Sequence, residues 1–553
     1  MIKRAMLVVL LAAIGGCSGP SDNSGDDQAA PVEQIGAPLF GDLGNHQYEI
    51  SSNNPLSQRY FNQGLNLAYG FNHHEAVRAF KEGARLDPGC AMCYWGQAVA
   101  LGPNINKAMD DADISAAYTA AQLALEKSAA STPVERALIV ALTARYDPQS
   151  NSDRVKLDAA YANAMREVAA QFPDDLEVRT LFAESLMDLM PWEYYEADGT
   201  PKRETTEVID ALEFVLAKNP EHPGAIHLYI HAVEATDAPE RAEPHADRLR
   251  NLVPGAGHLV HMPAHIYLRV GRYADASLAN ELAAAADESY INQCKAQGFY
   301  PATYYPHNIH FLWYTSAMEG RRQTSIEAAK KIYGVLPLDQ VEEFKEVEYF
   351  VPIPLLAYAR FGEWDAILAE APPPESWPYA SAMWHYTQGL AHIAKGNLDK
   401  AESELTAVDE ILAGELIDTR EILFILGRSN STIARTELAA RIELARGNAE
   451  AGIALLRVAI EKEDALPYVE PPYWYYPIRQ RLGAALMQTN AAAEAEAVFR
   501  RDLEIYKHNG WSLYGLHQSL LAQGKPEEAR QVEEQLNAIW QAADIELTNA
   551  VLN

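Results

Sequence analysis

The sequence predicts an all-α protein built from an extended series of helical hairpins. Alanine and leucine are abundant, and the alternation of apolar and polar residues that is typical of half-buried strands is scarce. The chain has 553 residues, which is more than one compact core normally requires. Similar residues also recur at a 34-residue interval, as Tyr60 and Tyr94 do. Length and recurrence together indicate an array of repeated units.

Acidic residues outnumber basic residues by 76 to 45, which gives a formal net charge of −31. Such a chain repels phosphate backbones and anionic lipid surfaces, and no basic cluster offsets this repulsion. We therefore expect no nucleic acid among its partners.

The first residues have the pattern of an export signal. Lys3 and Arg4 precede the apolar run 5–14, which is too short to span a membrane, and the leader ends in I-G-G-C (14–17) at Cys17. This resembles a bacterial lipobox. The resemblance implies lipidation of Cys17 and, in a Gram-negative cell, an outer-membrane lipoprotein that faces the periplasm and meets the membrane only through its lipid. An ordinary signal peptide that happens to contain Cys17 is the alternative.

The repeat is clearest in the segment 60–88, which carries Tyr60, Gly64, Ala76, Phe80 and Pro88. It resembles a tetratricopeptide repeat, in which small residues let two helices cross closely, large residues fill the gap, and proline ends the second helix. Related patterns continue to about residue 535. The resemblance implies a tetratricopeptide-type α-solenoid curved into a superhelix. First helices of repeats are expected near 58–70, 92–101, 176–190, 224–236, 257–270, 307–319 and 383–395.

Four regions follow from these patterns. They are a lipoprotein signal peptide (1–17), a Gly-, Ser- and Pro-rich tether (18–45), an N-terminal repeat array with a histidine-rich groove (46–345) and a C-terminal repeat array (346–553). Two segments interrupt the repeats: an aromatic and acidic loop, 190–201, and an aromatic segment, 470–477.

Three cysteines follow the lipobox: Cys90, Cys93 and Cys294. Cys90 and Cys93 form a C-x-x-C at a helix start, without the βαβ pattern of a thioredoxin. We expect a short-loop disulfide or two packed thiols rather than redox catalysis. Cys294 has no predicted disulfide partner.

Half of the sixteen histidines lie between His227 and His310, where an even distribution would place roughly two or three. They are His227, His231, His245, His258, His261, His265, His307 and His310. His227, His231 and Glu234 follow i, i+4, i+7 spacing, which places them on one helix face. The spacing i, i+3, i+7 does the same for His258, His261 and His265, and His307 and His310 are separated by three residues.

In tetratricopeptide arrays the first helix of each unit lines a concave groove, and the resemblance places seven of these histidines at groove positions. Glu184 and Glu234 fall at such positions as well, whereas His385 and His392 fall where helices pack together. Convergent imidazoles and carboxylates form a site for zinc, copper, iron or nickel. The predicted ligands are therefore a subset of His227, His231, His258, His261, His265, His307, His310, Glu184 and Glu234. The alternative is a metal-free polar groove whose histidines hydrogen-bond each other and a peptide.

The histidine clusters and the segments 71–76 and 102–106 also resemble blocks in a group of bacterial tetratricopeptide lipoproteins with a histidine-rich groove. We expect an exported, lipid-anchored protein whose groove binds a transition metal, a protein or peptide partner, or both. One alternative is a metal-dependent hydrolase or oxidoreductase, with Glu184 or Glu234 as ligand or general base and Tyr267, Tyr304 or Tyr314 orienting the substrate. The other is a metal-free periplasmic scaffold for protein assembly.

Overall fold

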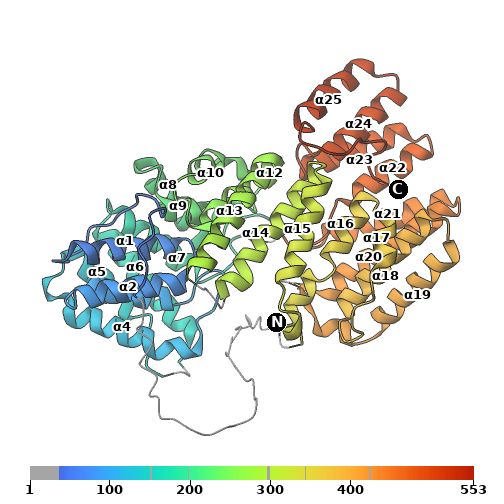
Figure 1. The fold of residues 1–553 in the computed structure, drawn as a ribbon. Helices are drawn as coiled ribbons and strands as arrows, with labels where there is room; N and C mark the ends of the chain where they lie inside the picture. The colour runs from blue at the N-terminus through green and yellow to red at the C-terminus, as the bar shows by residue number, and fades with distance from the viewer. Residues whose placement is uncertain are drawn as a thin grey trace, which may run out of the picture. The chain divides into compact units, whose positions relative to one another are not determined.

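The computed structural model describes residues 36–149, 152–196, 198–294, 299–342, 344–422 and 425–552 (Figure 1). The predicted signal peptide, the lipobox cysteine Cys17 and the tether up to residue 35 lie outside these ranges. Among the described residues, no helix combines the length and the apolar character that a membrane span requires.

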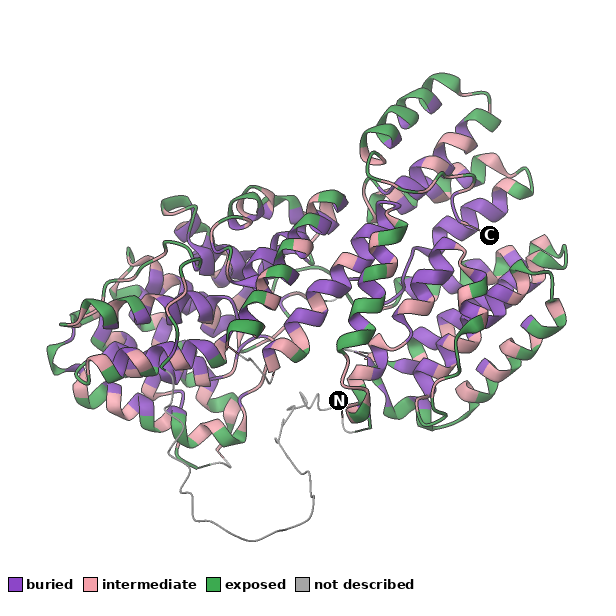
Figure 2. Ribbon diagram, viewed as in Figure 1, coloured by how far each residue is buried: buried purple, intermediate pink, exposed green. Residues whose placement is uncertain are grey.

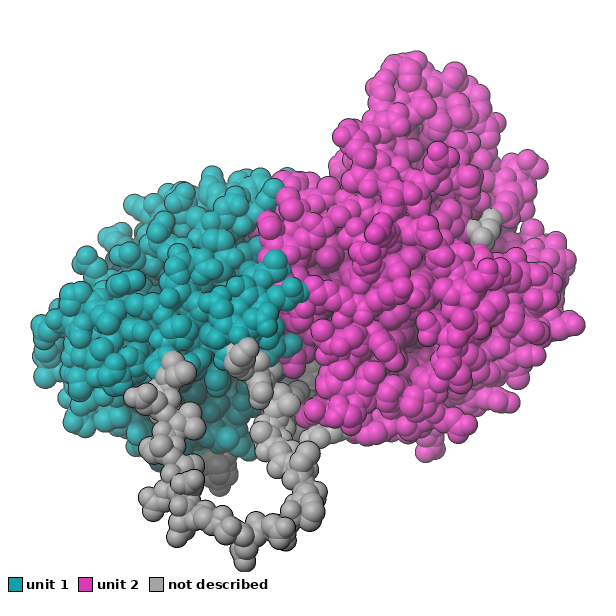
Figure 3. Space-filling view, viewed as in Figure 1, with its two compact units in different colours: residues 1–262, 285–301 teal, residues 263–284, 302–553 magenta. Residues whose placement is uncertain are grey.

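The chain divides into two compact units (Figure 3). Unit 1 comprises Met1–Met262 and Ala285–Pro301, and unit 2 comprises Pro263–Ala284 and Ala302–Asn553. This division differs from the boundary after residue 345 that the sequence suggested. The last residues of the predicted tether also belong to the packed part of unit 1, since Ala37 and Leu43 are buried and the Tyr60 hydroxyl donates to the Ala37 carbonyl over 2.8 Å.

Both units are all-α, as predicted. The helices up to Met262 are α1 (Pro55–Tyr69), α2 (His73–Leu86), α3 (Ala91–Leu101), α4 (Ile114–Lys127), α5 (Pro133–Thr143), α6 (Arg154–Gln171), α7 (Leu176–Met187), α8 (Arg203–Lys218), α9 (Pro223–Val233), α10 (Glu243–Leu249) and α11 (Gly257–His261). Consecutive helices pack on one another as antiparallel hairpins, with their buried faces turned inward (Figure 2).

The chain continues with α12 (Pro263–Val270), α13 (Tyr273–Cys294), α14 (Phe299–Met318), α15 (Arg322–Val335), α16 (Ile353–Phe361), α17 (Trp364–Ala369), α18 (Pro378–Ala394), α19 (Leu398–Ala413), α20 (Gly427–Ala445), α21 (Ala449–Asp464), α22 (Ile478–Gln488), α23 (Ala492–Ile505), α24 (Gly510–Ala522) and α25 (Pro526–Ile539). The described strands are β1 (Glu421–Ile422) and β2 (Ile425–Leu426), which pair antiparallel with Glu421 opposite Leu426.

The predicted first helices correspond to observed ones, with two differences. The segment 257–270 forms two helices, α11 and α12, because Pro263 has no N–H to continue the first. Helix α14 begins at Phe299, eight residues before the expected start at 307, and includes Pro306.

A phenylalanine held between two glycines fixes the helix crossing in each unit. In unit 1, a Cβ atom added to Gly64 or Gly96 would lie 2.7 or 2.5 Å from the Phe80 ring. Phe499 of unit 2 is enclosed in the same way by Gly483 and Gly515. Because only glycine leaves room for these fully buried rings, the helices on either side can approach closely.

Cys90 and Cys93 are joined by a disulfide at the start of α3, where the Cys90 sulfur also accepts the Cys93 backbone N–H over 3.1 Å. Cys294 is a free, half-buried thiol near the end of α13. Burial and the nearby Glu75 raise the pKa of Cys294 to about 11, so this thiol is a poor nucleophile at neutral pH.

Candidate metal centre

Helix α9 presents two histidines on one face. Pro223 occupies its first turn, and the His222 side chain caps it by accepting the Ala225 N–H over 3.1 Å. The four-residue spacing brings the rings of His227 and His231 to 4.9 Å from each other. The shared face that the spacing predicted is therefore present.

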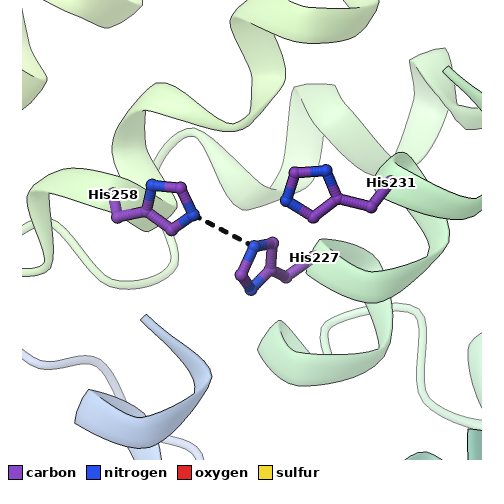
Figure 4. A group of neighbouring side chains, drawn as sticks. All are labelled: His227, His231 and His258. Carbon is purple, nitrogen blue, oxygen red and sulfur yellow. Dashed lines mark hydrogen bonds between the residues drawn. The ribbon is translucent and has the colours of Figure 1, made fainter. Parts of the chain in front are cut away.

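The short helix α11 adds His258 to this pair. The His258 backbone N–H donates to the Tyr300 hydroxyl over 3.1 Å, and that hydroxyl donates to Asp287 over 2.8 Å. Gly257 makes room for this support, since a Cβ at that position would overlap the Asp287 carboxylate. This position brings His258 Nε2 within 3.2 Å of His227 Nε2, and the two nitrogens share a hydrogen bond (Figure 4).

Hydrogen bonds to two of the rings determine which nitrogen carries the proton. His227 Nδ1 lies 2.6 Å from the Tyr69 carbonyl oxygen, and His231 Nδ1 lies 2.8 Å from Glu234 Oε1. A carbonyl or carboxylate oxygen can only accept, so both Nδ1 atoms carry protons. In the neutral rings the lone pair is then on Nε2, which is the arrangement that metal-ligating histidines adopt.

Two aromatic side chains cover the three imidazoles. The Phe71 ring lies 4.5 Å from the ring of His227 and 5.2 Å from that of His258, and the Trp192 ring lies 5.0 Å from that of His231. Phe71 and Trp192 both have positive φ, 54° and 63°, a conformation that costs bulky residues free energy. These two unfavourable backbone conformations place the rings of Phe71 and Trp192 over the histidines.

The three histidines are almost completely buried, with exposed fractions of 1%, 2% and 2% for His227, His231 and His258. The repeat positions predicted that they face a concave groove, and in the structure their side chains are not exposed on such a surface. Rings from the α1–α2 turn and from the loop 190–201 close over them, and the repeat pattern does not encode either contact. Burial removes competing water and strengthens electrostatic interactions at the site.

The three histidines could hold one metal ion. One ligand atom from each of His227, His231 and His258 can be chosen so that all three lie within 4.8 Å of one another. Nitrogens bound tetrahedrally to zinc at about 2.0–2.1 Å lie about 3.3 Å apart. The 3.2 Å between His227 Nε2 and His258 Nε2 is close to that value.

The predicted carboxylates take different places. Glu234 accepts a hydrogen bond from His231 Nδ1, the ring nitrogen that does not carry the lone pair. Glu184 lies on α7 and is not part of this three-histidine group. Burial raises the pKa of Glu184, Arg145 opposes the increase, and the Glu177 charge adds to it. His261 follows at the end of α11, with its ring 5.7 Å from that of His258.

The other predicted ligands belong to unit 2. The rings of His265 on α12 and His307 on α14 lie 5.9 Å apart, and His265 Nδ1 is 3.2 Å from Glu470 Oε2. Glu470 was not among the predicted site residues, although it begins the aromatic interruption 470–477. The sequence feature that could have identified Glu470 is its position at the start of the aromatic segment 470–477.

His310 has aromatic neighbours. Its ring lies 5.3 Å from Trp313, 5.7 Å from Tyr349 and 5.4 Å from Phe350. Among the described residues, it joins no group of three closely spaced metal-ligating atoms. Burial lowers the pKa of His310 to about 3, so this imidazole stays neutral in the folded protein down to acidic pH.

His310 should therefore contribute to acid sensitivity. Its pKa is about 3 when folded and about 6.5 when unfolded, so the unfolded state binds more protons as pH falls below 6.5. Stability is fully present above pH 6.5 and is lost between the two values. From pH 7 to pH 5 the loss from this one group is about 2 kcal/mol. His310→Phe should reduce the acid-induced loss of unfolding free energy by that amount in denaturant titrations. Equal losses in both proteins would contradict this assignment.

A second histidine cluster in unit 1 was missed from the sequence. Glu177 accepts from His46 Nε2 over 3.2 Å, from His222 Nε2 over 3.3 Å and from the Tyr69 hydroxyl. Burial would raise the pKa of Glu177, but His222 and His46 outweigh burial and hold it well below its usual value. His222 Nδ1 accepts a backbone N–H, so its Nε2 carries the proton and donates to Glu177. This cluster is a hydrogen-bonded carboxylate. It connects to the candidate centre through Tyr69, whose carbonyl accepts from His227.

No protein-family model and no curated protein matches the sequence. Among solved structures, the chain is similar to human IFIT1 in a dimer with m7Gppp-AAAA, at 13% identity over 91% of this chain and 92% of that chain, with a TM-score of 0.29. It is also similar to yeast Tom70, at 12% identity over 87% of this chain and 97% of that chain, with a TM-score of 0.30. Likeness at this level has no bearing on function.

Proposed function

We propose that the protein binds a transition metal ion through His227, His231 and His258 of unit 1. The observation that supports this most is the pair of Nδ1 hydrogen bonds, to the Tyr69 carbonyl and to Glu234, which places the lone pairs of His227 and His231 on Nε2, as in metal-ligating histidines. Three neutral imidazoles suit zinc, copper or iron. Three protein ligands would also leave one position for water or another group, as catalytic zinc sites do.

Metal binding is favoured over catalysis at this site. A hydrolytic centre needs a general base that can reach the bound water. Glu234, the carboxylate that contacts the histidines, is engaged by His231 Nδ1, and Phe71 and Trp192 cover the rings. We propose that the ion stabilises unit 1. Export, with lipidation at Cys17, remains part of the proposal on the evidence of the sequence.

Binding of a protein or peptide is the second candidate function, because helical-repeat arrays generally present extended surfaces to partners. Burial of His227, His231 and His258 at 1–2% exposure argues against a peptide contacting these side chains directly. A partner would have to bind elsewhere on the repeats.

Titration of the purified protein with Co²⁺ and Zn²⁺ tests the proposal. We expect one tightly bound ion in unit 1, visible as the d–d absorption of tetrahedral Co²⁺ and displaced by Zn²⁺. Ligation requires neutral imidazole, so affinity should fall as pH drops through about 6.5. If the protein binds neither ion at neutral pH, the metal-free interpretation of these histidines holds instead.

A further inference from the structure

Residues 36–54 form a segment that packs on the helices of unit 1 before the first helix begins. Its attachment is largely polar, as where the Phe40 N–H donates to the Gln63 side chain over 2.9 Å. The buried apolar side chains of the segment are Ala37 and Leu43. A segment with few buried apolar contacts opens at a lower free-energy cost than a core helix does. We therefore expect this segment to detach from unit 1 more readily than the helices separate.

His46 is the residue through which this segment contacts a buried acid. Its Nε2 donates to Glu177 Oε2 over 3.2 Å, and its carbonyl oxygen accepts from Asn66 Nδ2 over 3.0 Å. The side chains of His46 and Glu177 are 10% and 4% exposed. Because a buried carboxylate is costly unless hydrogen-bond donors surround it, the charge of Glu177 depends in part on the docked segment.

Glu177 has two further donors, which belong to other parts of unit 1. It accepts from His222 Nε2 over 3.3 Å and from the Tyr69 hydroxyl. The His46 and His222 rings lie 4.4 Å apart, and the His222 and Tyr69 rings lie 5.7 Å apart. An ionised carboxylate can only accept, so it serves all three donors at once.

The contact with His222 reaches the helix that carries two of the proposed metal ligands. Because His222 Nε2 donates to Glu177, the lone pair of this ring is on Nδ1, where it accepts the Ala225 N–H over 3.1 Å. This bond caps α9, the helix of His227 and His231. Glu177 thereby fixes the tautomer that the cap requires.

The contact with Tyr69 reaches His227 by a second route. The Tyr69 carbonyl oxygen lies 2.6 Å from His227 Nδ1, and the Tyr69 hydroxyl donates to Glu177. The Tyr69 ring also packs on the start of α9, since a Cβ atom added to Gly224 would lie 2.5 Å from it. Glu177 is thus connected to His227 both through the cap of α9 and through Tyr69.

We propose that the segment 36–54 regulates the metal centre, with Glu177 as the positioning residue that joins them. This inference rests on the metal site proposed above. When the segment opens, Glu177 loses the His46 donor, and the contacts that orient α9 and His227 weaken. Coupling between two sites is reciprocal, so a bound ion should in turn hold the segment in its docked position.

Co²⁺ titration of full-length variants, followed by the d–d absorption, measures the first half of the coupling. His46→Leu removes the donor, and Glu177→Gln leaves one acceptor oxygen where the carboxylate has two. Both should weaken Co²⁺ binding at least about five-fold, the lower end of typical coupling between sites. His46→Gln keeps an N–H that can donate to Glu177 and should bind Co²⁺ like the wild type.

Tyr229→Phe is the matched control on α9. It removes a hydrogen bond from a buried tyrosine to a carboxylate, from the Tyr229 hydroxyl to Glu213 over 2.8 Å, on another face of the same helix. This variant should bind Co²⁺ with unchanged affinity, whatever its Tm.

Amide hydrogen exchange measures the reverse half. Saturating Zn²⁺ should slow exchange of the Phe40 and Ile50 amides, which donate to Gln63 and Gln58, at least about five-fold in the wild type. The effect should shrink in Glu177→Gln. A Glu177 that only supports packing would lower the Tm of its variant without making the exchange of the segment depend on the ion.

The coupling would be overturned by equal Co²⁺ affinities in the wild type, His46→Leu and Glu177→Gln, or by segment exchange that does not respond to Zn²⁺. Equal weakening by His46→Gln and His46→Leu would also overturn it, because the donated hydrogen bond would then be irrelevant. All three results leave the metal site in place. A wild-type chain that binds neither Co²⁺ nor Zn²⁺ would instead overturn the metal site itself, and this inference with it.

Discussion

Replacing His227 and His258 together with alanine should abolish metal binding to unit 1, with a loss of affinity greater than about 100-fold. The two Nε2 atoms lie 3.2 Å apart, and with both removed only His231 of the three-histidine group remains. One imidazole does not hold a divalent ion against water and buffer. Metal analysis after dialysis and Co²⁺ absorption would measure the loss.

The matched control is the double variant His385→Ala/His392→Ala. These histidines lie half-buried on α18, and His385 Nδ1 pairs with Glu404 over 2.6 Å. Metal content should not change in this control. Glu234→Gln should give an intermediate result, a loss of about 10–100-fold, because the carboxylate orients His231 without binding the ion itself. Metal retained by His227→Ala/His258→Ala at the wild-type level would place the ion elsewhere.

Phe80→Ala should destabilise unit 1 by about 3–5 kcal/mol. The ring is 1% exposed and fills the space between Gly64 and Gly96, which have no side chains of their own to fill a cavity. Large-to-small substitutions cost most where the surroundings collapse least into the cavity. Denaturant titration would measure the change in unfolding free energy.

Phe499→Ala is the counterpart in unit 2, and the same loss is expected there. If the units unfold in separate transitions, each substitution should move only the transition of its own unit. Leu125→Ala and Leu521→Ala, at side chains that are 39% and 47% exposed, are the respective controls and should cost less than about 1 kcal/mol. A loss below that value for Phe80→Ala would show that the crossing does not depend on the ring.

The hairpin architecture could be predicted because its determinants are local. Gly64, Ala76 and Phe80 show which helices cross closely, and the spacing of His227 and His231 places them on one helix face. The same reasoning could not place Phe71 or Trp192, because their contacts with the histidines connect residues more than a hundred and roughly forty positions apart. Such contacts depend on loop conformation, which has no periodic signal in a sequence.

The sequence also did not separate the functions of the individual histidines. His310 has the spacing of a ligand, yet its neighbours are Trp313, Tyr349 and Phe350. His46 and His222 lie outside the dense bursts and form a carboxylate cluster with Glu177. Three-dimensional neighbours, rather than helix position, decide whether an imidazole is neutral and isolated or engaged with an acid.

The cover formed by Phe71 and Trp192 limits how fast an ion can enter or leave the site. An ion cannot reach side chains that are 1–2% exposed unless a segment opens, so entry and exit must wait for that opening. The rate of uptake should then level off at high ion concentration, at the frequency with which the α1–α2 turn or the loop 190–201 moves aside. An ion once bound would exchange slowly even with a strong competitor outside. The site would therefore retain the first suitable ion it captures over many encounters with others.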